Sequence, residues 1–467
     1  MRKNYELDMT EGPIVKQLIR FALPILAVNI LQILFTTADT VVLGRFVPEE
    51  RSTVAVAAVG ATTSLINLLI GFFVGISLGA NVLVARCKGG NNPERAKKYV
   101  GCSVLLSLIS GMAILLIGFF GAETFLSWMN CKNELLALAT KYLKIYFLGM
   151  PLIMLYNFAA SILRAVGDTV RPLIFLLAGG VLNVGLNIFF VTAVGLDVEG
   201  VAIATVASNA VSAICCLVVM LKSKGFCRLD LKYLRIFGKE LKDLLYLGIP
   251  SGLQKVFFSI TNVLIQANVN AFGPFATAGN SVSSEIDKYI YEVGESLAIS
   301  TLSFTGQNME AKKYDRVKET IKKTIMLIVC TSLPLGILAS VFSEPLCLAI
   351  RNDLAILPYA QSRLYVMATT YFICSIMGVF GYVLRGMGKS LTSMIISLVG
   401  SCLLRIVVVY VLGWFFPGNF LVLFLSYPIS WLIGVCIQIT VLSKLFSSLQ
   451  KSKTAEISEN KENEKVA

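Results

Sequence analysis

Apolar runs of about 20 residues recur along almost the whole of this 467-residue chain. A run of that length can cross the hydrocarbon core of a bilayer as a helix, which satisfies every backbone N–H and C=O internally. Composition agrees, because only 15% of the residues are charged, against roughly 25% in soluble domains. The sequence therefore predicts an all-α polytopic membrane protein of the cell membrane.

Twelve ranges are apolar enough to be predicted as membrane-spanning helices. They are 18–44, 54–83, 100–121, 139–162, 172–194, 200–221, 244–271, 276–304, 322–342, 356–384, 391–413 and 420–446. The connections between them alternate in charge: 31 Lys and Arg fall on one side with the two termini, and 7 on the other. By the positive-inside rule, both termini are predicted to be cytoplasmic. The net charge of +13 is thus a topology signal, and we expect no nucleic-acid partner.

The two halves of the chain repeat each other at a period of about 220 residues. FALPILAVNI (21–30) matches YLGIPSGLQK (246–255), and LRAVGDTVRPLI (163–174) matches LRGMGKSLTSMI (384–395), whose Gly167 and Gly388 we interpret as turns. Six spans per half make the repeat parallel, an arrangement that many transporters share. We expect an N-terminal lobe (1–221), a cytoplasmic linker (222–243), a C-terminal lobe (244–446) and a disordered cytoplasmic tail (447–467).

Several motifs in this order resemble the multidrug and toxic compound extrusion (MATE) family. They are TADTVVLGRF after a proline-bearing first helix, VAAVGATTSL, ARCKGGNNPERAKK, LRAVGDTVRP, VLNVGLNIFFV followed by GVAIATVAS, and SFTGQNMEAKKYDRVK. The resemblance covers roughly residues 12 to 446. It implies twelve helices in two pseudo-symmetric six-helix lobes around a cavity. It also implies export of small organic, usually cationic, compounds in exchange for H⁺ or Na⁺.

Asp39 is the only charged residue between Arg20 and Arg45, deep inside the first predicted span. A charge there costs about 3 kcal/mol on insertion scales, so its carboxylate must face a partner or a water-filled cavity. Other oxygens that could share a proton or a Na⁺ ion with it are those of Thr36, Asn183, Asn187 and Thr205. The resemblance implies the same pairing, with Asn187 where relatives often carry a second acid. The alternative interpretation is a carboxylate that only fixes helix packing.

A second charged cluster lies in the eighth predicted span, as one stripe of Glu285, Lys288, Glu292 and Glu295. Asp287 points away from this stripe. Lys288 and Glu292 are spaced to pair along the helix, and Lys255 of the seventh span is a candidate partner for Glu292 or Glu295. Two interpretations stay open: a static ion-pair network, or carboxylates that bind a cationic substrate or the coupling proton.

Other functional classes have little support in this sequence. It contains no histidine and no CxxC among its eleven cysteines, so we expect no enzyme and no cofactor beyond the coupling H⁺ or Na⁺. The expected partners are small organic cations and membrane lipids, and the expected state is a monomer. Two alternatives remain: a lipid-linked precursor flippase, which would need a more basic cavity, and a non-transporting receptor or scaffold, which would not need the buried acids.

Overall fold

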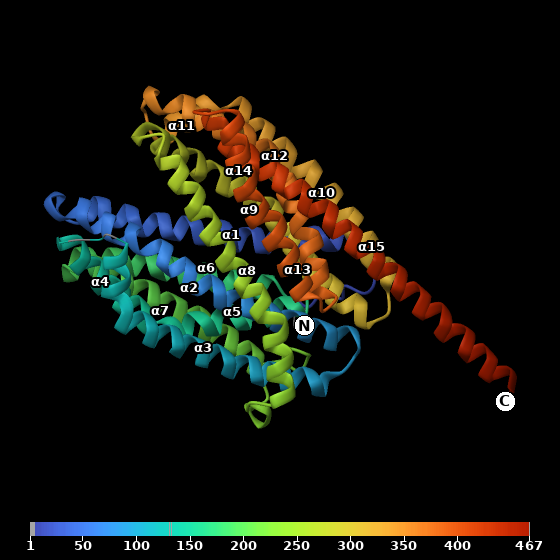
Figure 1. Cartoon of the computed structure of the whole chain (residues 1–467). Helices are drawn as coiled ribbons and strands as arrows, with labels where there is room; N and C mark the ends of the chain where they lie inside the picture. The colour runs from blue at the N-terminus through green and yellow to red at the C-terminus, as the bar shows by residue number, and fades with distance from the viewer. Residues whose placement is uncertain (1–4, 130, 132, 467) are drawn as a thin grey trace. The chain divides into compact units, whose positions relative to one another are not determined.

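A computed structural model describes residues 5–129, 131 and 133–466, and none of these forms a β-strand (Figure 1). The chain forms two compact units. The first comprises Met1–Ile260 with Leu302–Ala311, and the second comprises Thr261–Thr301 with Lys312–Ala467. The boundary between the units therefore falls inside a helix near Ile260, rather than in the linker 222–243 that separates the repeats in the sequence.

The first unit is built from seven long helices and the beginning of an eighth. Its elements are α1 (Ile14–Phe46), α2 (Glu49–Gly89), α3 (Pro93–Trp128), α4 (Asn133–Leu148), α5 (Met150–Ala165), α6 (Val170–Ile188), a π-helical turn η1 (Phe189–Val194), α7 (Val198–Lys222), the 3₁₀ turn η2 (Leu231–Tyr233) and the start of α8 (Gly238–Asn270). Helix α7 packs against α4, α5 and α6, and α2 packs against α3, α4 and α5.

The second unit follows the same plan with a different set of interruptions. Its elements are the rest of α8, most of α9 (Pro274–Glu310), α10 (Tyr314–Val341), α11 (Ser343–Ile350), the 3₁₀ turn η3 (Leu354–Ile356), α12 (Leu357–Gly386), α13 (Ser390–Ser397), the π-helical turn η4 (Leu398–Leu403), α14 (Leu404–Phe415) and α15 (Phe420–Val466). Helix α12 lies against α10 and α15, and α14 lies against α15.

All twelve predicted ranges coincide with helices or with consecutive helical segments. Among the described residues, nine helices are long and apolar enough to cross a membrane, and a tenth span results if the bent pair α4–α5 counts as one. The remaining two predicted spans coincide with α8 and α9, which are 33 and 37 residues long but are not among these apolar helices.

Two predicted stretches differ in the structure. The range 139–162 is not one straight helix, because α4 and α5 meet at an angle of 52°. Pro151, the second residue of α5, lacks the N–H that a continuous helix would need there. The second stretch is 447–467, for which the sequence predicts disorder, whereas α15 continues to Val466. This segment contains four Lys and four Glu residues, which favour helix.

The repeat is visible in the turns after α5 and α12. Gly167 and Gly388 both adopt positive φ, of 88° and 78°. At the first turn, the Gly167 N–H donates to the Arg164 carbonyl and the Asp168 N–H to the Leu163 carbonyl; Gly388 and Lys389 repeat this pattern one repeat later. This is the Schellman ending of a helix, which requires a glycine at the left-handed position. The interpretation of both glycines as turns is confirmed.

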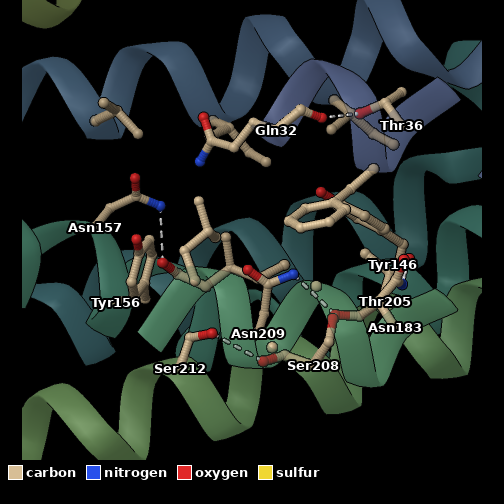
Figure 2. Close-up of a pocket in the computed structure, with 18 of the residues that line it drawn as sticks. Gln32, Thr36, Tyr146, Tyr156, Asn157, Asn183, Thr205, Ser208, Asn209 and Ser212 are labelled. Carbon is tan, nitrogen blue, oxygen red and sulfur yellow. Dashed lines mark hydrogen bonds between the residues drawn. The ribbon is translucent and has the colours of Figure 1, made fainter. Parts of the chain in front are cut away.

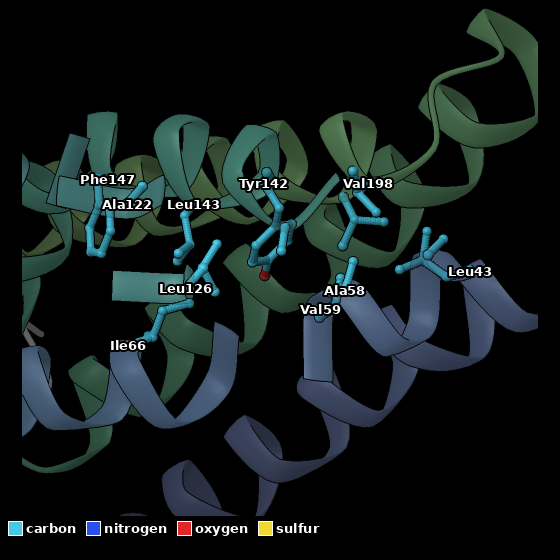
Figure 3. Packing of buried hydrophobic residues seen from close by; sticks show 14 of the residues in the cluster. Leu43, Ala58, Val59, Ile66, Ala122, Leu126, Tyr142, Leu143, Phe147 and Val198 are labelled. Atoms are coloured by element: carbon cyan, nitrogen blue, oxygen red, sulfur yellow. The ribbon is translucent and has the colours of Figure 1, made fainter. Parts of the chain in front are cut away.

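One end of the first unit is closed by an apolar cluster from α1, α2, α3, α4 and α7 (Figure 3). Leu43, Leu126, Leu143, Phe147 and Val198 all have no exposed surface. The cluster fixes how α1, the helix of Asp39, lies against its neighbours.

Helices α2 and α8 cross at glycines spaced four residues apart. A Cβ on Gly75 would lie 2.4 Å from the Gly252 Cα, and one on Gly79 would lie 2.7 Å from the Leu244 carbonyl oxygen. Small residues at this spacing let two membrane helices bring their backbones into contact. One turn along α2, the Gly71 Cβ position lies 3.9 Å from the Lys255 Cβ. The crossing therefore places Lys255 beside α2 within the first unit.

The end of α9 belongs to the first unit because polar contacts hold it there. The Gln307 Nε2 donates to the Ala165 carbonyl at 2.8 Å, and its Oε1 accepts from the Met9 N–H at 3.2 Å. Ser303 Oγ donates to Asn81 Oδ1 at 3.0 Å. Met9 and Gln307 have no exposed surface, so these contacts tie the N-terminal segment, α5 and α9 together.

Candidate functional site

A cavity of about 440 Å³ opens within the first unit, between α1, α2, α5, α6 and α7, with contributions from α4 and α8. Its apolar walls include Phe35, Ile70 and Leu176. Gly180 on α6 leaves room for Phe35, because a Cβ there would lie 1.8 Å from the Phe35 ring. Figure 2 shows polar side chains from α1, α5 and α7 directed into the same space. The cavity is thus large enough for a small organic molecule and is lined by both kinds of surface.

Asp39 lies in the wall of this cavity, 8% exposed, among polar groups of α6 and α7. Its Oδ1 accepts from the Asn187 Nδ2 at 2.5 Å, and its Oδ2 lies 3.5 Å from the Thr205 hydroxyl. Asn183 joins the cluster, because its Oδ1 accepts from Asn187 Nδ2 at 3.3 Å and its Nδ2 donates to Thr205 Oγ1 at 3.3 Å. The structure therefore brings together four of the five residues predicted for this site.

Thr36, the fifth residue, lines the cavity but does not donate its hydrogen bond to the Asp39 carboxylate. Its hydroxyl donates to the Gln32 carbonyl of the same helix at 3.0 Å. It lines the cavity beside Asp39 on α1. As drawn in Figure 2, Thr36 lies one turn from Gln32 on the same helix.

The hydrogen bonds around Asp39 leave one buried oxygen without a partner. Thr205 has a single hydroxyl proton, and its shorter bond is to the Val201 carbonyl at 2.9 Å, so it supports the carboxylate weakly. Asn187 has no exposed surface, and its Oδ1 has no hydrogen-bond partner among the described residues. A buried oxygen without a hydrogen-bond partner lies next to a carboxylate, with amide and hydroxyl oxygens alongside. Such a group of oxygens provides the ligands that a proton or a hard cation such as Na⁺ needs.

The part of the chain that the structure describes contains no group of three or more His, Cys, Asp or Glu side chains that could hold a metal ion. The cluster at Asp39 therefore offers one charged ligand and neutral oxygens. It fits a singly charged ion better than the carboxylate-rich cages of Ca²⁺.

The sequence analysis missed several polar side chains of the cavity; besides Tyr156, Ser208 and Ser212, five more stand out. Four are amides within apolar helices, Gln32, Asn67, Asn157 and Asn209, and the fifth is Tyr146. Asn157 and Asn209 donate to carbonyls one turn back, at 2.8 Å each (Figure 2). Their signal in the sequence is a polar residue inside an apolar run, but only the packing of five helices shows that they face one space.

Lys255 also lines this cavity, where its side chain is exposed. No described residue of the first unit forms an ion pair or hydrogen bond with its ammonium group. Glu292 and Glu295 belong to the second unit, so their predicted pairing with Lys255 stays a prediction.

The charged stripe of α9 divides into two parts. Glu285 and Lys288 are exposed and pair with each other at 2.6 Å. Glu292 and Glu295 are half-buried, and the Tyr382 hydroxyl of α12 donates to Glu295. Lys288 therefore pairs with Glu285, three residues earlier, and not with Glu292, four residues later, as the spacing predicted. A hydroxyl donor on Glu295 suits an ionised carboxylate within the helix bundle.

Asp287, which the sequence analysis placed off the stripe, is 2% exposed. Its Oδ2 accepts from Arg363 Nε at 3.0 Å, and Arg363 Nη1 donates to Asn280 Oδ1 at 2.5 Å. Arg363 lies inside α12, within the predicted span 356–384. This buried pair joins α9 to α12 within the second unit.

A family model of the description MatE matches residues 24–189 and 250–411, which is most of the chain and both halves of the repeat. The chain belongs to the MatE family.

Curated relatives agree with this membership. The chain is 26% identical over 422 residues to the probable multidrug resistance protein YoeA of Bacillus subtilis, covering 89% of this chain and 90% of that protein. It is 27% identical over 422 residues to the probable multidrug resistance protein NorM of Thermotoga maritima, covering 89% of each. As a MatE chain, this protein is a multi-pass membrane transporter of the multidrug efflux class.

Solved structures share the fold. An outward-facing multidrug resistance MATE family transporter superposes with a TM-score of 0.88 at 20% identity, over 97% of this chain and 100% of that one. A MATE in a bent conformation gives 0.88 at 20% identity, over 96% and 98%. The two-lobed arrangement of helices expected from the repeat is therefore the MATE fold.

Proposed function

We propose that this MatE transporter is a cation-coupled antiporter in which Asp39 carries the coupling H⁺ or Na⁺ and small organic compounds leave through the cavity beside it. One observation carries the proposal: a carboxylate in the cavity wall meets only neutral partners, next to the unpartnered Asn187 Oδ1. Among the described cavity residues, no basic side chain neutralises it. A bound cation or proton supplies the missing charge.

Coupling follows from competition for this site. When Asp39 holds a proton or Na⁺, the polar cluster is electrically satisfied, and a cationic group on the substrate loses its attraction to the wall. When the ion leaves, the carboxylate can attract that group. Exclusive binding of the ion and the substrate is sufficient for exchange, if the two lobes expose the cavity alternately to each side.

The second unit offers a rival coupling site at Glu292 and Glu295. Both are half-buried, and Glu295 accepts from Tyr382. We assign the primary role to Asp39, because its cluster lines a cavity and contains an unpartnered oxygen. The static interpretation of the stripe is supported for Glu285 and Lys288, which already form an exposed pair.

The orientation and substrate class follow from the charges. We infer that both termini face the cytoplasm, because the Lys and Arg excess lies in the connections on their side. We infer a monomer whose substrates are small organic compounds, because the relatives are named multidrug resistance proteins. We infer that these compounds carry a cationic centre, because the Asp39 carboxylate in the cavity wall would attract one. The cavity has one amine among its described lining residues, which does not favour a pyrophosphate-linked lipid.

The test is efflux of a fluorescent cation from proteoliposomes under an imposed pH or Na⁺ gradient. We expect one gradient to drive efflux by the wild type and Asp39→Asn to abolish the dependence on it. The control is Glu123→Gln, an exposed acid on α3 outside the cavity, which should leave efflux unchanged. Absence of gradient-driven efflux in the wild type would refute antiport. Gradient-driven efflux in Asp39→Asn with loss in Glu292→Gln or Glu295→Gln would move coupling to the stripe.

A further inference from the structure

We propose that Lys255 forms an anion-binding subsite in the cavity of the first unit, and that the compounds transported carry an acidic group, such as a carboxylate, which this lysine binds. The inference rests on the proposed function and refines its substrate class. Compounds with both a cationic centre and an acidic group are then the preferred cargo.

The first argument is the position of Lys255. Its Cβ lies close to the Gly71 backbone, where α2 and α8 are in contact through Gly75 and Gly252. No side chain at residue 71 stands between the lysine and the cavity, and the lysine side chain is exposed there. A closely packed glycine crossing therefore holds the base of this side chain, and only its flexible end is free to meet a ligand.

The second argument is that the two charges of the cavity differ in their surroundings. Asp39 is 8% exposed and accepts from Asn187 and Thr205. Lys255 is exposed and has no described partner in its unit. The acid is recessed in the wall, whereas the amine is presented to the interior, where it is free to bind an anionic group.

The third argument is the separation of these charges. Asp39 is seven residues before the end of α1, whereas Gly71, which lies beside Lys255, is twenty-two residues after the start of α2. At 1.5 Å per residue, their backbones lie roughly 20 Å apart along the antiparallel pair α1–α2. Asp39 cannot neutralise Lys255 over this distance in an ion pair. The acidic group of a ligand is then the counter-charge that Lys255 can meet inside the cavity.

The fourth argument is the supply of further donors near the lysine. Asn67 lies one turn from Gly71 on α2, and Gln32 projects from α1 into the cavity in Figure 2. The side-chain amides of Asn67 and Gln32 have no hydrogen-bond partner among the described residues of the unit. An ammonium group with two unengaged amides is suited to bind a carboxylate. The apolar walls at Ile70 and Leu176 suit the body of an amphipathic molecule.

The experiment compares two dyes that differ at one group. Rhodamine B carries a free carboxylate and a cationic xanthene, and its ethyl ester keeps the cation without the acid. Binding of each dye to the purified protein and efflux from proteoliposomes are measured for wild type, Lys255→Gln, Lys255→Arg and Glu292→Gln. We expect the wild type to prefer the acid. We expect Lys255→Gln to weaken binding of the acid about tenfold or more, with the ester unaffected, and Lys255→Arg to retain the preference.

Several outcomes separate this proposal from its alternatives. An equal effect of Lys255→Gln on both dyes, reproduced by Glu292→Gln, would overturn the subsite and make Lys255 an ion-pair partner of the α9 stripe. Equal wild-type affinity for the two dyes, or binding of neither, would also overturn it. Gradient-driven efflux of both dyes without any effect of Lys255→Gln rejects the anion subsite alone. Absence of efflux of either dye from the wild type rejects the proposed transport as well. The control Lys239→Gln, an exposed lysine at the start of the same helix as Lys255 and outside the cavity lining, should change neither dye.

Discussion

The crossing of α2 and α8 predicts that Gly75→Ala destabilises the protein although alanine is the better helix former. The new methyl would lie 2.4 Å from the Gly252 Cα, 2.5 Å from its N and 2.8 Å from the Ser251 carbonyl carbon. All three atoms are backbone, so no side-chain rotation relieves the contact. Reaching an ordinary separation of about 3.5 Å requires the helices to move apart by roughly 1 Å.

The size of the effect follows from two opposing terms. Overpacking of a closely packed contact costs about 1–3 kcal/mol, and replacing glycine by alanine in a helix returns up to about 1 kcal/mol. The matched control is Gly60→Ala in the same helix, where nothing lies within 4 Å of the new Cβ. Gly60→Ala receives only the favourable term. The difference between the two variants is therefore the full packing cost.

The assay is the apparent melting temperature of the detergent-solubilised protein, read from intrinsic fluorescence. We expect Gly75→Ala to melt a few degrees below the wild type and Gly60→Ala to melt at or above it. Because the crossing positions Lys255, Gly75→Ala should also weaken binding of rhodamine B. Equal melting temperatures for Gly75→Ala and Gly60→Ala would refute the close approach of α2 and α8.

Two further predictions concern charges outside the cavity. Arg363→Gln should destabilise the protein by roughly 3 kcal/mol and lower its apparent melting temperature, because the variant leaves the Asp287 carboxylate buried without a counter-charge. Adding Asp287→Asn should restore much of the lost stability. Equal losses in the single and the double variant would contradict the pairing. Burial raises the pKa of Asp168, in the turn before α6, above its ordinary 3.8 and outweighs the effect of the nearby Arg171. The folded state then binds the proton more tightly than the unfolded state, so stability falls as the pH rises from 3.8 through the raised pKa. A melting-temperature series against pH should lose part of this slope in Asp168→Asn, and an unchanged slope would exclude Asp168 as its source.

Much of the fold was predictable because membrane helices can be recognised in the sequence by their length and their apolar composition. The twelve ranges and the two glycine turns rest on such local signals, and the structure places helices and turns there. The bend between α4 and α5 has a local cause in Pro151, which the span prediction did not use. The glycine crossing also had a signal, since Gly71, Gly75 and Gly79 are spaced by four.

The site was predictable where its residues share a helix face and much less so where helices meet. Asn183 and Asn187 lie four apart, and a buried acid needs partners, so their grouping with Asp39 could be predicted from the sequence. The place of Lys255 could not, because it depends on how α8 lies against α2. Arg363 illustrates the same limit, since only the packing of α12 against α9 shows that it is the partner of Asp287.

The central claim, that ion and substrate exchange at Asp39, is tested most directly by substrate-driven ion movement. Proteoliposomes are loaded with rhodamine B without any ion gradient, and the entry or exit of H⁺ and Na⁺ is followed with ion-selective dyes. For the wild type we expect one of the two ions to move against the dye flux. We expect that ion movement to disappear in Asp39→Asn and to persist in Glu123→Gln. Ion movement that persists in Asp39→Asn would contradict the account.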